Sequence, residues 1–344
     1  MKSTKPILAI TMGDPAGIGP EIAVKTFEGS ELHKVCRPIL VGNAAIMEKA
    51  LTFSEKNLKV RTISDVKEAR FETGVMEVLD IGMPLDETIE FGEISAVAGN
   101  LAFHSVIIAI ELAKNGEVDG TVTNPIHKKA INEAGHHFSG HTEIYAEYTN
   151  TPKYAMLLAD DAIKVIHVST HVSLRKACDL VKKERVLEVI GIMNDGLKRL
   201  GIEKPRIGVA GLNPHAGDEG LFGDEEINEI APAVKEAQNN GLDVTGPVPP
   251  DTLFALASGG RFDGCVAMYH DQGHIPFKLA GFHWDQEKGK MKSVNGVNIT
   301  LGLPIIRTSV DHGTAFEIAG KGIASPDALM NAVEYAVKLT KNRQ

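Results

Sequence analysis

Short apolar runs alternate with longer amphipathic stretches along most of the chain, and this alternation limits the possible folds more than any other feature. The predicted strands are Ile7–Met12, Ile39–Val41, Met76–Ile81, Gly120–Thr123, Ala155–Ala159, Lys164–Val168, Arg206–Gly211 and Asp263–Met268. The predicted helices are Ile94–Lys114, Glu184–Leu200, Glu225–Asn239 and Asp327–Lys341. Strands separated by helices pair in a mostly parallel sheet with helices on both faces. The predicted fold class is therefore α/β.

The domain organisation is harder to predict, because the sequence has no internal repeat, low-complexity tract or flexible linker. The best candidate for a boundary is Asn124-Pro125, and the chain is expected to return to the first domain late. We expect a first α/β domain at 1–125 plus 285–344 and a second at 126–284.

Composition excludes several classes of protein. The 344 residues carry a net charge of −9 without a cluster of basic residues, which argues against a nucleic-acid partner. A local basic pocket for a small anion remains compatible with that charge. Three cysteines without a CxxC pair favour neither disulfides nor a cysteine zinc site, so a reducing cytoplasm is expected. We see no apolar stretch of the roughly 18 residues that would span a bilayer, and predict a protein that does not contact membranes.

Three histidines follow three predicted strands: His171, His215 and His270. In an open α/β sheet, ligands bind outside the carboxyl ends of the strands. Imidazole is the commonest metal ligand, and three of them leave coordination positions open for water or substrate. A single histidine at a strand end is more often structural, but three at equivalent ends favour a metal site. His167 and His104 are expected to be structural.

Other polar segments have two interpretations each. The glycines of the first loop, Gly13–Glu21, match neither GxGxxG nor GxxxxGK[ST], so close backbone packing is favoured over nucleotide binding. Ser139–Glu143 either contacts substrate or begins a helix with Thr142 as its cap. Lys278 and Arg307 would suit a phosphate or carboxylate if they converged, but each alone is typical of a surface charge.

Taken together, these motifs resemble the 4-hydroxythreonine-4-phosphate dehydrogenase family nearly end to end. The matching segments are Thr11–Glu21, Ser139–Glu143, Asn213–Gly217, Tyr269–Gly273, Val297–Pro304 and Arg307–Ala315. The segment His312–Pro326 is also similar to the cofactor loop of isopropylmalate and isocitrate dehydrogenases. The resemblance implies a three-layer α/β/α, two-domain fold of the isopropylmalate dehydrogenase type, with the active site in a cleft and at a dimer interface.

The resemblance also implies roles for individual residues. Its implied metal ligands are His171, His215 and His270; its substrate contacts are His141, Thr142, Lys278, Asn298 and Arg307; its cofactor loop is His312, Gly313, Thr314 and Ala315. Asp251, Asp271 and Lys278 are the implied catalytic or proton-transfer candidates. NAD would bind without a Rossmann fingerprint, and homodimers would share metal ligands between subunits. Three imidazoles favour zinc, cobalt or nickel, with magnesium also possible.

Two features depart from the usual vitamin B6 enzyme of this family. His274 stands where an apolar residue is expected, and a charged stretch, Phe282–Ser293, separates Lys278 from Asn298. The segments Val165–Ala177 and Gly273–Phe282 look closer to the second branch of the family, which oxidises 4-phospho-D-threonate and 4-phospho-D-erythronate to dihydroxyacetone phosphate and CO₂. The alternative is 4-hydroxy-L-threonine phosphate oxidation in pyridoxal phosphate synthesis. More distant alternatives are a metal-dependent hydrolase or acyltransferase, or a module that only binds a phosphometabolite.

Overall fold

The chain forms two compact units in the computed structural model, which describes residues 5–85, 88–281, 284–286, 290–291 and 296–342. The first unit comprises Met1–Pro152 and Leu303–Lys341, and the second comprises Lys153–Gly302 with Asn342–Gln344. Both junctions lie later in the chain than the sequence analysis placed them. The physical reason at the first junction is that Ile131, Ile144 and Tyr145 are buried in the core of the first unit.

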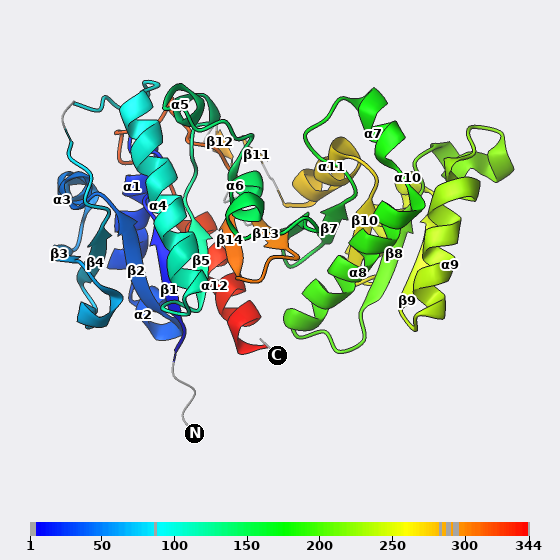
Figure 1. Ribbon diagram of the computed structural model, residues 1–344, viewed down its shortest axis with the longest axis horizontal. Helices are drawn as coiled ribbons and strands as arrows, with labels where there is room; N and C mark the ends of the chain where they lie inside the picture. The colour runs from blue at the N-terminus through cyan, green and yellow to red at the C-terminus, as the bar shows by residue number, and fades with distance from the viewer. Residues whose placement is uncertain (1–4, 86–87, 282–283, 287–289, 292–295, 343–344) are drawn as a thin grey trace. The chain divides into compact units, whose positions relative to one another are not determined.

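The first unit contains six parallel strands in the order β3-β4-β2-β1-β5-β14 (Figure 1). Their bounds are β1 (Ile7–Thr11), β2 (Arg37–Gly42), β3 (Lys59–Ile63), β4 (Val75–Asp80), β5 (Gly120–Thr123) and β14 (Arg307–Val310). The inner strands β1, β2 and β5 are buried over almost their whole length, as parallel strands covered on both faces must be, and β5 carries the buried polar residues Thr121 and Thr123.

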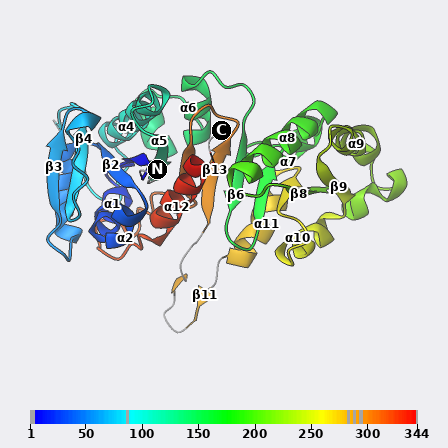
Figure 2. The same cartoon turned by 90° about the horizontal axis from the view of Figure 1, so that it is seen from below.

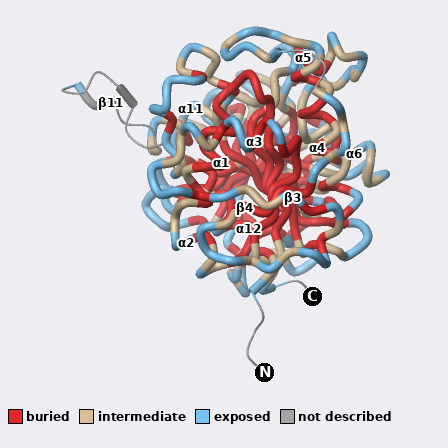
Figure 3. Tube along the Cα trace, turned by 90° about the vertical axis from the view of Figure 1, so that its left-hand side faces the viewer, coloured by how far each residue is buried: buried red, intermediate tan, exposed pale blue. Residues whose placement is uncertain are grey.

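Helices cover both faces of this sheet. They are α1 (Gly19–Glu28), α2 (Ser30–Val35), α3 (Ala44–Ala50), α4 (Ala96–Lys114), α5 (Lys128–Glu133), α6 (His141–Tyr148) and α12 (Asp327–Lys341). Helix α4 packs on β1, β2 and β5, whereas α1 and α12 pack together on the opposite face (Figure 2). The buried residues follow the strands, and the outer faces of the helices are exposed (Figure 3).

Helix α4 corrects one expectation from the sequence. It is 19 residues long and apolar enough to cross a membrane by length and composition, although the sequence analysis saw no such stretch. Of its most apolar window, 61% is buried inside the protein. Its contacts with three strands and with α5 identify it as a core helix of the first unit.

The second unit has the strand order β13-β6-β7-β10-β8-β9. Its strands are β6 (Ala155–Ala159), β7 (Lys164–His167), β8 (Arg206–Ala210), β9 (Asp243–Val248), β10 (Gly264–Ala267) and β13 (Val297–Leu301). Strands β7, β10, β8 and β9 are parallel, whereas β6 is antiparallel to both β13 and β7. The carboxyl ends of β7, β10 and β8 therefore lie side by side at one edge of the sheet.

Helices again cover both faces of the second unit. They are α7 (Leu174–Leu180), α8 (Lys183–Arg199), α9 (Ala231–Asn239), α10 (Pro250–Ser258) and α11 (His270–Gly281). Two irregular turns, η3 (Pro214–Gly220) and the π-helical η4 (Glu226–Ile230), connect β8 to α9. Strands β11 (Trp284–Asp285) and β12 (Lys290–Met291) form a separate pair. The charged stretch Phe282–Ser293 lies partly outside the described residues.

Candidate functional site

The three strand-end histidines lie where the topology places the carboxyl ends of neighbouring parallel strands. His171 follows β7, His215 lies in η3 after β8, and His270 begins α11 after β10. The rings of His171 and His270 are 5.9 Å apart between centroids. Within the described part of the chain, however, no group of three or more His, Cys, Asp or Glu side chains is placed to hold a metal ion. One chain thus provides the predicted ligands without assembling all three.

A hydrogen bond and a stacked ring determine which nitrogen of His270 keeps its lone pair and how the ring is oriented. Its Nδ1 donates to the Asp271 carboxylate at 2.6 Å, which leaves Nε2 as the nitrogen with a lone pair. The ring of His274 stacks on that of His270 at 3.6 Å with 10° between the planes. His274 Nδ1 in turn donates to the His270 carbonyl at 3.0 Å. These contacts hold the His270 ring in one orientation.

The row of imidazoles continues into the core of the second unit. The His274 ring lies 4.8 Å from that of His167, which is buried, as expected for a structural histidine. Burial first, and then the charges of neighbouring histidines, lower the pKa of His274 to about 4 and that of His167 to about 3, so both rings are neutral at neutral pH. Gly273 is required here, because a Cβ would lie 2.4 Å from His167 Nε2.

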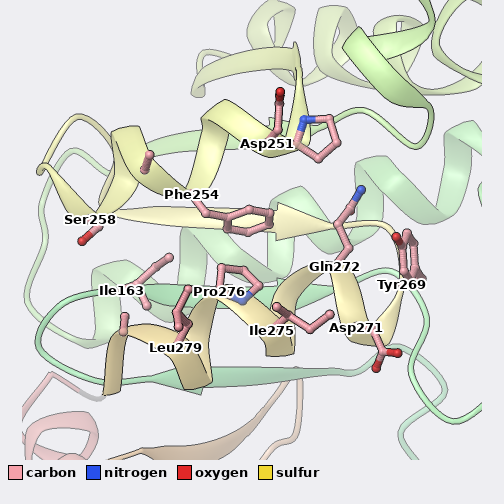
Figure 4. Close-up of a pocket in the computed structure, with 13 residues that line it drawn as sticks. Ile163, Asp251, Phe254, Ser258, Tyr269, Asp271, Gln272, Ile275, Pro276 and Leu279 are labelled. Atoms are coloured by element: carbon pink, nitrogen blue, oxygen red, sulfur yellow. The ribbon is translucent and has the colours of Figure 1, made fainter. Parts of the chain in front are cut away.

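The acidic candidates line one cavity of the second unit. Asp251, in the first turn of α10, and Asp271, in the first turn of α11, border a cavity of about 520 Å³ with Tyr269 and Gln272 (Figure 4). Its remaining wall is largely apolar. Gln272, which sequence reasoning missed, accepts from Met268 N at 2.7 Å and donates to the Gly211 carbonyl at 2.8 Å. It thereby ties the start of α11 to the ends of β10 and β8.

Two of the predicted substrate contacts come together in the first unit. Arg307 on β14 is buried, and its Nη2 donates to Thr123 Oγ1 at 2.9 Å. Burial lowers the pKa of Arg307 to about 10, so the guanidinium keeps its charge at neutral pH. Burial first, and then the charge of Arg307, lower the pKa of His141 well below its usual value. His141 Nε2 is buried and has no hydrogen-bond partner in the described structure.

The remaining substrate candidates are distributed between the two units. Thr142 is the second residue of α6 in the first unit, and the N-cap is Gly140, so the capping interpretation of Thr142 is wrong. Lys278 lies in the last turn of α11 and Asn298 on β13, both in the second unit. The Asn298 Oδ1 is buried and has no partner in the described residues.

The predicted cofactor loop rests on the first glycine loop. The carbonyl of Thr314 accepts from Ile18 N at 3.0 Å. Gly17 permits this approach, because a Cβ would lie 2.8 Å from the Thr314 carbonyl oxygen. Ala315 has a φ of 46°, and the next residue, Phe316, stacks on His127 at 4.7 Å. The first loop therefore has the packing role that its glycine spacing favoured.

Asp14 in the same loop is a buried carboxyl group that the sequence analysis did not single out. Its Oδ1 accepts from Ala16 N at 2.9 Å, while its Oδ2 is buried without a partner in the described residues. Burial raises the pKa of Asp14 to about 6, against the smaller opposing effect of backbone hydrogen bonds. No sequence pattern signals a shift of this kind, because it depends on how tightly the loop is enclosed.

The fold and the site define a two-unit α/β protein with histidines at the ends of neighbouring parallel strands and a buried arginine that keeps its charge. The family model for the pyridoxal phosphate biosynthetic protein PdxA matches residues 34–336, and the chain belongs to this family.

Its relatives match over their full length. D-threonate 4-phosphate dehydrogenase of Salmonella typhimurium is 48% identical, with 96% of this chain and 98% of that protein covered. D-threonate 4-phosphate dehydrogenase of Pectobacterium atrosepticum is 45% identical, with 97% and 99% covered. The crystal structure of 4-hydroxythreonine-4-phosphate dehydrogenase from Klebsiella pneumoniae is 44% identical with a TM-score of 0.84, covering 98% of this chain and all of that one.

Proposed function

We propose that this protein oxidises and decarboxylates a 4-phosphorylated 3-hydroxy acid, with 4-phospho-D-threonate as its main substrate and 4-phospho-D-erythronate as a second. The observation that carries the reaction class is family membership, together with the buried charge of Arg307 close to His141. The choice of substrate rests on the names of relatives that are 45% and 48% identical to the chain.

The first unit supplies the phosphate end of this proposal. A buried guanidinium that keeps its charge attracts a phosphate more strongly than an exposed one, since water does not screen it. The neutral His141 beside it offers a donor or an acceptor without adding charge. Holding the phosphate far from the reacting carbon orients the substrate and lowers the entropic part of the barrier.

The second unit supplies the groups near the reacting carbon. Asp251 and Asp271 border one cavity, and either carboxylate is an acceptor for the proton that the substrate hydroxyl loses. Asp271 also orients His270. Lys278 is a proposed donor to the substrate carboxylate or to the enolate that remains after CO₂ leaves.

The donor set fits a divalent cation and the loop fits NAD. Imidazoles of His171, His215 and His270 would hold zinc or cobalt, and magnesium is a further possibility; the cation supplies Lewis-acid polarisation of the hydroxyl. His312, Gly313, Thr314 and Ala315 would contact NAD, which accepts the hydride. The local observation that supports the metal ligand role is the bond from His270 Nδ1 to Asp271, which leaves Nε2 as the nitrogen with a lone pair.

A homodimer with shared active sites is part of the proposal. Large apolar side chains are exposed on the same segments that carry the histidines: Val172, Leu174, Leu221, Phe222, Ile275 and Leu279. Leu279 is 77% exposed and Ile275 65%. Exposed apolar groups of this size are typical of subunit interfaces. A partner chain would also supply the third metal ligand, because one chain does not bring all three histidines together. A reducing, cytoplasmic location suits the three free cysteines.

The test is NADH formation with 4-phospho-D-threonate, 4-phospho-D-erythronate and 4-hydroxy-L-threonine phosphate at equal concentration. We expect the first to give the highest kcat/KM, with release of CO₂, loss of activity after chelation, and recovery on adding zinc, cobalt or magnesium. A higher value for 4-hydroxy-L-threonine phosphate would instead support the activity that the Klebsiella pneumoniae structure is named for. No NADH from any of them would contradict the proposal.

A further inference from the structure

The loop that carries His215 has a backbone conformation that needs support from elsewhere. His215, Ala216, Gly217, Asp218 and Glu219 all have positive φ, with values of 53°, 55°, 83°, 45° and 56°. Left-handed conformations are costly for residues with a Cβ, and they occur as single residues far more often than in runs. Only Gly217 in this run escapes that cost. The loop therefore keeps its shape only if neighbouring groups hold it.

The carboxylate of Glu226 makes the strongest contacts with this loop. Its Oε1 accepts from the backbone N–H groups of Leu212 and Asn213, both at 2.7 Å. Its Oε2 accepts from Asn213 Nδ2 at 3.0 Å. Glu226 is only 3% exposed, so these are charge-assisted hydrogen bonds in a buried setting, which is where such bonds are strongest.

Two glycines let the loop close around this carboxylate. A Cβ on Gly211 would lie 3.0 Å from Glu226 Oε1, and a Cβ on Gly217 would lie 2.7 Å from Oε2. The carboxylate thus occupies the inside of the turn, while His215 is exposed on its outside. The backbone of Asn213 is hydrogen-bonded to this carboxylate two residues before His215, and Gly217 packs closely against it two residues after.

Glu226 itself stands on a rigid support. It is the first residue of the π-helical turn η4, and π-helical turns occur frequently at functional sites. Ile230, at the end of the turn, is fully buried. Glu229 in the same turn accepts from Lys182 Nζ at 2.9 Å and from Lys183 N at 2.8 Å. The carboxylate of Glu226 therefore has a fixed position against which the loop is held.

We propose that Glu226 is a positioning residue for the metal site. Glu226 holds His215 in the left-handed loop so that the His215 ring faces the cation. This inference rests on the proposed function, because it assumes that His215 is a ligand. Residues that orient a metal ligand through hydrogen bonds commonly change metal affinity by about 10- to 100-fold when they are replaced.

The experiment compares Glu226→Ala, Glu226→Gln and Glu225→Gln with the wild type. Glu225 is the matched control, since it accepts from the same Asn213 Nδ2 at 2.7 Å but, among the described residues, makes no hydrogen bond to the loop backbone. Titration calorimetry with Co²⁺ or Zn²⁺ gives the metal affinity. Hydrogen exchange of the Leu212 and Asn213 amides reports the loop independently of metal. Circular dichroism confirms that each variant folds.

We expect Glu226→Ala to weaken metal binding about 10- to 100-fold and to speed exchange of the two amides. Glu226→Gln should lie between it and the wild type, because the amide oxygen still accepts the two backbone bonds, and Glu225→Gln should resemble the wild type. Unchanged exchange would overturn the inference even in a protein that binds metal well. Faster exchange with unchanged metal affinity would show a merely structural role and overturn it too. A wild type that binds no metal but shows the protected amides would refute the proposed metal site, and the inference with it.

Discussion

At the scale of single residues, the sequence predicted candidate site residues but not their charge states. Arg307 and His141 were expected as substrate contacts, and the structure adds that one keeps its charge while the other is neutral. These differences come from burial, which depends on what encloses a side chain rather than on its neighbours in sequence. Asp14 is a clearer example of a pKa shift that the sequence does not reveal, because the sequence analysis interpreted its loop only through the glycines.

The buried carboxyl of Asp14 predicts a specific pH dependence of stability. Its pKa is raised from an ordinary value of 3.8 to about 6, so the folded state favours the protonated form. The stabilising effect of that proton is complete below about pH 4 and is lost as the pH rises through about 6, at a cost of up to about 3 kcal/mol. Asp14→Asn, which cannot ionise, should therefore be more stable than the wild type at pH 7 but not at pH 4.

Urea unfolding of both proteins at several pH values between 4 and 8 measures this difference directly. The difference in free energy of unfolding should grow between pH 4 and pH 6 and then stay constant. The comparison at pH 4 is the internal control, because both side chains are neutral there. A difference that does not change with pH would show that Asp14 ionises as an ordinary carboxyl in the folded protein.

At the scale of elements, apolar periodicity predicted the buried strands and failed where strands are short or partly polar. Eight predicted strands and the four long helices occur close to their expected positions, with the start of Glu225–Asn239 replaced by a π-helical turn. Strands β3 and β9 were missed because their exposed and charged residues interrupt the apolar run. Strand β14 was missed because Arg307, Thr308 and Ser309 are buried polar residues. Apolar periodicity does not predict backbone conformations such as the left-handed turn at His215.

The contact between the first glycine loop and the cofactor loop predicts the effect of Gly17→Ala. A Cβ at this position would lie 2.8 Å from the Thr314 carbonyl oxygen and 2.9 Å from the Thr314 Cβ, so Thr314 has to move. Displacing a group that positions a reactant by about 1 Å can lower the reaction rate about 100-fold. We therefore expect the displaced cofactor loop to weaken NAD binding about tenfold or more. Steady-state kinetics should show a higher KM for NAD and an unchanged KM for the phosphorylated substrate.

Gly191→Ala is the matched control for that substitution. Gly191 lies within α8, and a Cβ there would meet nothing within 4 Å. The exchange should be neutral or stabilise the helix by about 0.5–1 kcal/mol, with kinetics unchanged. Equal KM values for NAD in the wild type and Gly17→Ala would show that the cofactor does not depend on the position of Thr314.

At the scale of the whole molecule, the sequence predicted three candidate metal ligands but not the arrangement that would complete a metal site. The strand order brings the ends of β7, β10 and β8 together, yet no three metal-binding side chains of the described residues converge within one chain. Apolar exposure on α7, η3 and α11 supplies the physical reason to expect a second chain. Nothing in a single sequence states which surface is buried by a partner, because exposure is known only after folding.

Shared sites predict a particular pattern of complementation between inactive variants. If a twofold dimer builds each site from two histidines of one subunit and one of the other, His171→Ala, His215→Ala and His270→Ala are each inactive alone. Mixed in pairs and refolded together, two of the three combinations should recover about a quarter of wild-type activity, because half of the dimers are mixed and each holds one intact site. The third combination pairs the two variants that lack histidines supplied to a site by the same subunit. It should remain inactive and serves as the control. NADH formation by the mixtures decides the matter, since sites built within single chains would give no recovery in any of the three.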